Sequence, residues 1–316
     1  MATVAPPAGE IRGIVERSLT GRRSDIRSGL FRGALLLALL ISLFVLVVLF
    51  ASTLIDAWPV FRDRGFDFVT SNTSSLTSKV GVRQGIVGSL ILAGFVAVVA
   101  IPLGVASAIY LQEYARDTRL NRILITNTRN LAGVPSVVYG ILGLVVFVKA
   151  LHSVTGPDTH GRSYVSGGLT LSILVMPIVI LVTMEALRAV PNSIREAAYG
   201  VGATRWEVVR SHVLPYAAPG VFTGTILSLA RAFGETAPLL LVGAVTGFLA
   251  SPSGRSPVEI LQGQYTALPT QIYAWSKLPA QEWREIAAAA IIVLLVVILL
   301  VNAVAIVFRN RYERTW

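Results

Sequence analysis

The run GALLLALLISLFVLVVLFASTLI at residues 33–55 contains no charged side chain. The hydrocarbon core of a bilayer is about 30 Å thick, and a helix needs about 20 mostly apolar residues to cross it. This run therefore predicts a membrane-spanning helix. Four further uncharged runs of similar length follow it, at residues 86–111, 131–148, 165–184 and 286–308. A sixth run, 220–245, is equally apolar except for Arg231 and Glu235. The sequence thus predicts an all-α polytopic membrane protein with six transmembrane helices.

The overall composition agrees with this fold class. Apolar residues make up 54% of the 316 residues and charged residues only 14%, whereas soluble domains carry about 25% charged residues. Cysteine is absent, which excludes disulfides and thiolate metal sites. The three histidines fall in loops predicted on opposite sides of the membrane, so we expect no metal site. About 32 residues precede the first span, unlike a secretory signal, and we expect that span to be retained.

The basic residues are distributed unevenly between the predicted loops. The tails at 1–32 and 309–316 and the loops at 112–130 and 185–219 hold 17 of the 27 Lys and Arg residues. The three loops on the other side have a similar total length and hold 9, while Arg231 lies inside a span. Cytoplasmic loops carry the excess of Lys and Arg in membrane proteins. We therefore expect both termini in the cytoplasm and a permease domain over residues 33–308.

The loop at 185–219 is long and polar, and its sequence predicts two short helices. Ser193 and Glu196 have the spacing of a capping box, which predicts a helix that begins at Ser193. Gly200 and Gly202 should weaken that helix and allow a bend. Helical periodicity resumes at Arg205 and should end at Pro215.

The same loop carries a family pattern. Glu196-Ala197-Ala198, followed by Gly202 and then by Leu214-Pro215, resembles the EAA loop of ABC-importer permeases. His212 departs from the pattern, which has isoleucine there. The resemblance implies the type I permease fold, with a coupling helix that docks in a groove of a separate ATPase subunit. It implies that Glu196, Ala197, Ala198, Gly202, Leu214 and Pro215 couple the chain to that ATPase. An ordinary amphipathic connector is the alternative.

Three further stretches are similar to the phosphate-specific permeases, and to the PstA-type subunit rather than its PstC-type partner. They are LRAVP at 187–191, ARAFGETAP at 230–238, and QIYAW at 271–275 together with RNRY at 309–312. This resemblance implies inorganic phosphate as the transported solute. It also implies a transporter with four kinds of component. This chain and a PstC-type permease lie in a bacterial inner membrane, two copies of an ATPase lie in the cytoplasm, and a phosphate-binding protein lies outside.

The sequence lacks the phosphate loop G-x-x-x-x-G-K-[ST], since none of its three lysines follows a glycine. We therefore expect no ATP site and no cofactor on this chain, with ATP and Mg²⁺ bound by the partner ATPase. An enzymatic function is not expected.

Arg231, Glu235 and Thr236 are the candidate substrate-path residues. A charge near mid-membrane is costly and is a functional candidate by default. Glu235 follows Arg231 by four residues on the same helix face and can neutralise it. Arg231 could then contact the anion, or the two residues could form a closed pair that only holds the bundle together. Pro238 cannot donate to the carbonyl of Gly234, so we expect a kink close to Glu235.

Other functions are alternatives to an ABC-importer permease. A secondary transporter would need coupling residues within the chain, and a channel would need a ring of pore-lining groups. The single Arg and Glu within the spans give little support to either. A membrane anchor or sensor would not require an intramembrane charge. A permease for sulfate, molybdate or phosphonate is the closest alternative to a phosphate permease.

Overall fold

We describe residues 26–246 and 256–312 of a computed structural model of the chain. The described residues form helices joined by short loops and contain no strand. They divide into two compact units, Met1–Ser52 and Thr53–Trp316. Helix α2 (Ile26–Arg64) runs from the first unit into the second.

The expected all-α membrane fold is confirmed. The long elements are α2, α4 (Arg83–Ile109), α5 (Arg119–Ala132), α8 (Tyr164–Arg188), α11 (Leu214–Gly234) and α15 (Gln281–Tyr312). Five helices of the described chain are long and apolar enough to cross a membrane. A bent pair, α5 with α6 (Ser136–Gly143) and its extension η2 (Leu144–Ala150), makes six if it counts as one span.

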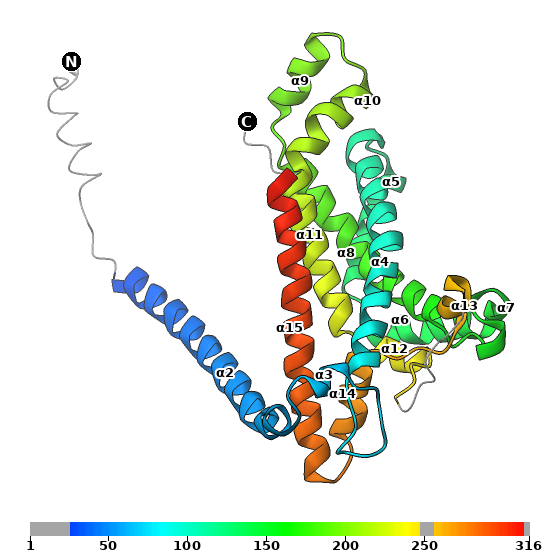
Figure 1. The fold of residues 1–316 in the computed structure, drawn as a ribbon. Coiled ribbons are helices and arrows are strands. Elements are labelled where there is room, and N and C mark those ends of the chain that lie inside the picture. The colour runs from blue at the N-terminus through cyan, green and yellow to red at the C-terminus, as the bar shows by residue number, and fades with distance from the viewer. Residues whose placement is uncertain (1–25, 247–255, 313–316) are drawn as a thin grey trace, which may run out of the picture. The chain divides into compact units, whose positions relative to one another are not determined.

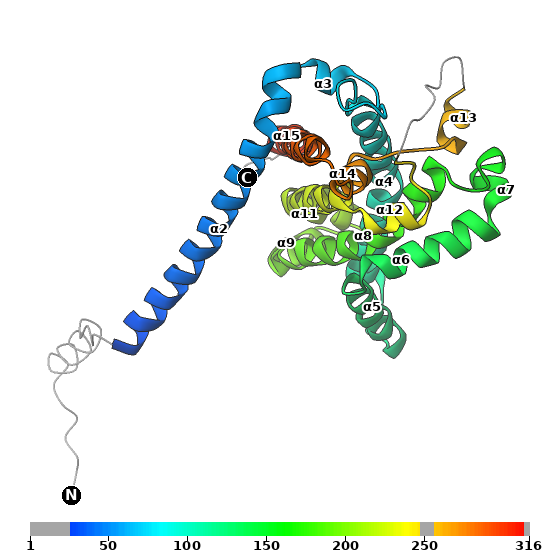
Figure 2. The same cartoon turned by 90° about the horizontal axis from the view of Figure 1, so that it is seen from below.

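Helix α8 lies at the centre of the second unit. Figure 2 shows α8 with α4, α6 and α11 around it. Its side chains Leu171, Val175 and Val179 are buried together with Leu92 and Val96 of α4. Small residues let the helices approach closely: a Cβ at Gly104 would lie 2.8 Å from Val179, and one at Gly224 would collide with Val182. The hydrophobic effect does not drive helices together inside a bilayer, so close van der Waals packing of this kind holds membrane helices together.

The predicted span at 131–148 corresponds to a bent pair of helices that begins earlier in the chain. The chain is already helical from Arg119, where the Thr118 side chain accepts a hydrogen bond from the Asn121 amide. The helix breaks after Ala132, and the second half departs at 101°. Pro135 explains the break, because a residue before proline is disfavoured in helical geometry and proline itself donates no backbone hydrogen bond. An apolar run shows how long a segment is, but it does not show that the segment bends.

The predicted single helix over 220–245 is also interrupted. Helix α11 ends at Gly234, Glu235 is extended (φ −75°, ψ 116°), and α12 (Ala237–Leu241) begins a new helix. The kink expected from Pro238 is therefore confirmed, and it is a complete break.

The long connection after α12 returns to the core. Helix α13 (Pro257–Gln262) is short, and α14 (Leu268–Ser276) packs against α4 and α15. The Ser89 hydroxyl accepts a hydrogen bond from the backbone N–H of Leu268 at 2.9 Å. The buried side-chain amide of Gln271 donates to the Thr73 hydroxyl at 2.9 Å. This connection is therefore part of the scaffold. Further short elements are α3 (Asp67–Thr70), α7 (His152–Thr155) and η3 (Pro157–Thr159), besides those that follow α4 and those between α8 and α11.

The close contact between α4 and the segment before α14 gives a stability prediction. A Cβ at Gly88 would collide with the carbonyl oxygen of Thr266, whereas a Cβ at Gly94 on the same helix meets nothing within 4 Å. Overpacking a tight core costs about 1–3 kcal/mol. We expect Gly88→Ala to lower the thermal unfolding midpoint of the purified protein in detergent. Gly94→Ala is the matched control and should leave the midpoint unchanged. Equal midpoints for the two variants would contradict this packing.

Candidate functional site

The loop between α8 and α11 forms two short helices at one end of the bundle. They are α9 (Asn192–Gly200) and α10 (Arg205–Val208), and they lie at the same end as the C-terminal end of α15 (Figure 1). Between them, Gly202 has φ +84°, a left-handed conformation that favours glycine. The predicted pair of helices around a glycine bend is therefore confirmed.

The predicted capping box at Ser193 and Glu196 is wrong. Helix α9 begins one residue earlier, at Asn192 after Pro191, and no side chain caps it. Ser193 already lies inside the first turn, where its hydroxyl cannot take the cap position. The capping box is instead made by Thr204 and Glu207 at the start of α10: Glu207 accepts from the Thr204 amide at 2.7 Å, and the Thr204 hydroxyl accepts from the Glu207 amide at 3.4 Å.

Pro215 does not end the second helix. A π-helical turn, η4 (Val209–Val213), joins α10 directly to α11, and Pro215 lies in the first turn of α11. Proline has no backbone N–H to donate. The wider i→i+5 hydrogen bonding of the π turn lets the helix continue past Pro215. Helix α10 and the following span therefore form one continuous helix, which connects the loop directly to the bundle.

The family-pattern residues lie on two faces of this loop. Ala198 is 5% exposed and belongs to an apolar cluster with Leu187, Val190, Val208, Val213 and Ala217, and Leu214 packs at its edge. Glu196, Ala197, Gly202 and Pro215 are exposed. The exposed face also presents large apolar side chains, Tyr199, Val201 and Trp206, which are 47%, 86% and 60% exposed. The loop thus has its own small core and an outward apolar surface.

Arg195 holds the start of α9 to two other helices. Its guanidinium binds both carboxylate oxygens of Glu113, at 2.7 and 3.3 Å. It also donates to the carbonyls of Leu187 at 2.9 Å and Val190 at 2.8 Å, at the C-terminal end of α8. The Arg195 and Glu113 side chains are 16% and 9% exposed. Removing one partner of a buried pair costs about 3–5 kcal/mol, because the other charge is left without compensation.

Glu113 lies in η1 (Tyr110–Tyr114), a π-helical turn that extends α4. Its two neighbours also contact arginines: Gln112 accepts from Arg188 at 3.0 Å, and the Arg205 guanidinium lies 5.2 Å from the centre of the Tyr114 ring. No sequence pattern predicted these contacts. Glu113 and Arg195 are 82 residues apart, and no local spacing connects them.

The proposed path residues lie at the break after α11. Arg231 is in the last turn, and its Nε is 3.4 Å from a Glu235 oxygen. The Arg231 side chain is 50% exposed and that of Glu235 is 15% exposed. The structure therefore brings Arg231 and Glu235 together and places the partly buried Thr236 next to them.

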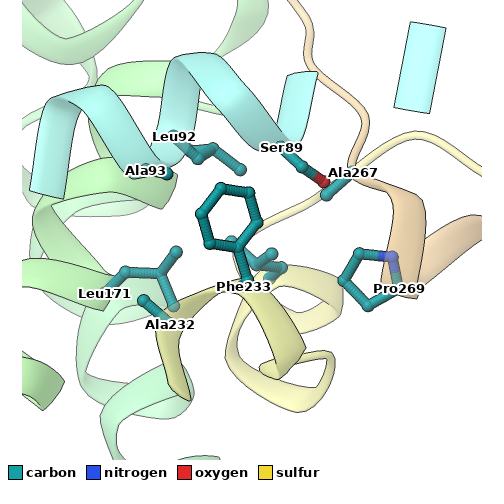
Figure 3. A pocket seen from close by; sticks show the side chains of 9 residues that line it. Ser89, Leu92, Ala93, Leu171, Ala232, Phe233, Ala267 and Pro269 are labelled. Atoms are coloured by element: carbon teal, nitrogen blue, oxygen red, sulfur yellow. The ribbon is translucent and has the colours of Figure 1, made fainter. Parts of the chain in front are cut away.

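A small hollow beside this break does not include the charged pair. It is lined by Ser89, Leu92, Ala93, Leu171, Ala232, Phe233, Leu239, Ala267 and Pro269. In Figure 3, Phe233 projects toward Leu92 and Ala93. The lining is apolar apart from one hydroxyl, so the hollow has no group to neutralise an anion.

A family model described as "Binding-protein-dependent transport system inner membrane component" matches residues 100–314, which include α9, α10 and the whole of α11. The chain belongs to this family. A relative is the phosphate transport system permease protein PstC of Mesorhizobium japonicum, which is 30% identical over 245 residues, 72% of this chain and 75% of PstC. PstA 1 of Mycobacterium tuberculosis (strain CDC 1551 / Oshkosh) is 35% identical over 61% of this chain and 59% of its own length. The probable ABC transporter permease protein YqgI of Bacillus subtilis is 32% identical, over 64% of this chain, and the chain spans 65% of it.

Solved structures show the same permease fold. A chain of a bacterial alginate ABC transporter matches with a TM-score of 0.63 at 19% identity, covering 91% of this chain and 98% of the other. A chain of the MetNI methionine ABC transporter matches with a TM-score of 0.53 at 16% identity, covering 74% and 95%. These two likenesses confirm the expected ABC-importer permease fold.

The bend between α9 and α10 gives a second prediction. Gly200 and Gly202 both have open space around a built Cβ, but only Gly202 has a positive φ. A left-handed residue other than glycine costs about 1–2 kcal/mol. We expect Gly202→Ala to raise amide hydrogen exchange across 203–208 by about tenfold. Gly200→Ala should leave exchange unchanged or slower, since alanine favours a helix. Equal protection in both variants would show that the bend does not depend on Gly202.

Proposed function

We propose that this chain is a membrane-spanning permease subunit of an ATP-driven importer for inorganic phosphate, located in a bacterial plasma membrane. The observation that carries the proposal is the loop of α9 and α10: a small apolar core joined rigidly to the bundle, with Glu196, Tyr199, Val201 and Trp206 exposed on its outer side. Large exposed apolar groups on a polar loop are typical of a protein interface. The permease names of the relatives support the transport role.

The partner set follows from this role. The chain carries no phosphate loop, so ATP and Mg²⁺ belong to a separate ATPase, two copies of which dock at the coupling loops. Relatives named PstA and PstC support a heterodimer of two similar permeases, in which we assign this chain the PstA-type position. An external phosphate-binding protein delivers the substrate, and the complex of the alginate transporter with its periplasmic protein supports such a partner. Both termini lie in the cytoplasm, as the basic residues indicate.

Phosphate rather than another oxyanion is supported by the relatives named as phosphate transport permeases. A permease for sulfate, molybdate or phosphonate is the alternative. We assign Arg231, Glu235 and Thr236 to the substrate path. Arg231 offers planar donors that match phosphate oxygens, and Glu235 limits how tightly an anion is held. The half-exposed Arg231 side chain fits contact with a passing anion or with the second permease.

The direct test is transport in proteoliposomes that contain both permeases and the ATPase, with the binding protein added outside. We expect ATP-dependent uptake of labelled phosphate that excess sulfate, molybdate or phosphonate does not compete away. The chain alone should show neither ATP hydrolysis nor uphill uptake. Hydrolysis by a homogeneous preparation of the chain alone, or uptake of sulfate in preference to phosphate, would contradict the proposal.

A second test concerns the path residues. We expect Arg231→Gln to abolish phosphate uptake in a complex that still assembles, because the anion loses its positive partner. Arg231→Lys keeps the charge without the planar fork and should retain partial activity. The double variant Arg231→Gln with Glu235→Gln has no uncompensated charge. Normal uptake by this double variant would show that the two residues form only a structural pair.

A further inference from the structure

The turn η1 contacts three successive parts of the coupling region. Gln112, Glu113 and Tyr114 are consecutive, and they meet Arg188 at the end of α8, Arg195 in α9 and Arg205 in α10. π-helical turns are rare and often lie at functional sites. These contacts lie beside the loop to which the proposed function assigns ATPase docking, and this inference rests on that function.

Helix α4 has no direct chain connection to the coupling loop. The loop is continuous with α8 on one side and with α11 on the other, so a movement of α9 reaches both helices through the backbone. The contacts from η1 to Arg188 and Arg195 instead join residues 76 and 82 positions apart. Beyond its packing along α8, α4 is therefore linked to the loop through side chains.

Of these links, the one between Glu113 and Arg195 is the most firmly held. Both side chains are largely buried, and Arg195 reaches both carboxylate oxygens as well as two carbonyls of the α8 end. Arg188, by contrast, is 39% exposed and divides its donors between Gln112 and an exposed Glu185. A planar guanidinium with fixed partners at the ends of two other helices resists displacement in more than one direction.

We propose that Glu113 and Arg195 are positioning residues that fasten the end of α4 to the coupling helix, so that a movement of α9 driven by the ATPase reaches α4 together with α8 and α11. Neither residue contacts the substrate. Their effect is to keep three spans moving as one body when ATP is bound and hydrolysed. Loss of the link leaves an ATPase that docks, turns over and moves α8 and α11, while the end of α4 fails to follow.

The test measures ATP hydrolysis and phosphate uptake in the same proteoliposomes and takes their ratio. We expect Glu113→Gln and Arg195→Gln each to lower phosphate moved per ATP by at least tenfold, with hydrolysis within about threefold of wild type. Arg188→Gln touches the same π turn through an exposed side chain and is the matched control, with an expected change under twofold. A role in folding alone would lower uptake and hydrolysis together, in proportion to the amount of assembled complex.

The double variant Glu113→Gln with Arg195→Gln separates stability from coupling. It leaves no uncompensated buried charge, so its thermal stability should recover toward wild type while the ratio stays low. A double variant with the wild-type ratio, or one that fails to assemble, would overturn the proposal. If the complex moves another oxyanion, the ratio is taken with that anion, so failure of the phosphate assignment does not decide this test.

Discussion

A buried guanidinium must have hydrogen-bonding partners, and Arg195 satisfies this requirement with groups from two other parts of the chain. Charge buried without compensation is costly, so the Glu113 carboxylate and the carbonyls of Leu187 and Val190 are held in place around it. The end of α4, the end of α8 and the start of α9 are fixed by this one side chain. The loop of α9 and α10 is therefore an extension of the bundle and not an independent appendage.

The bundle differs in rigidity between its two ends. Toward the coupling loop, α10, η4 and α11 form a continuous helix, and the loop has its own apolar cluster. At the other end of α11 the helix is broken at Glu235, beside Arg231. Irregular backbone at membrane depth is tolerated where it is buried in protein or lines a cavity. In the proposed transporter, movement would enter through this continuous helix and reach the break beside Arg231.

The sequence predicted much of this fold because apolar run length directly reports a membrane crossing. It did not predict the 101° bend at 133–135, since a bent helix and a straight one have the same composition. The capping box was misplaced because Ser193 and Thr204 both have glutamate three residues later, and the start of α9 directly after Pro191 decides between them. The bend at Gly202 was predicted correctly, because glycine weakens a helix locally. The Arg195–Glu113 pair spans 82 residues and depends on the packing of α4 against α8, which one sequence does not reveal.

The most direct test is a distance measurement between α9 and α4 in the assembled transporter. The chain contains no cysteine, so spin labels can be placed through Ser193→Cys and Ala106→Cys, at two exposed positions. If the coupling loop and α4 move as one body, the distance distribution between the labels should be the same without nucleotide and with trapped ATP, and it should broaden when Arg195→Gln is added. A shift of several ångströms on ATP trapping in the otherwise wild-type protein would contradict the account.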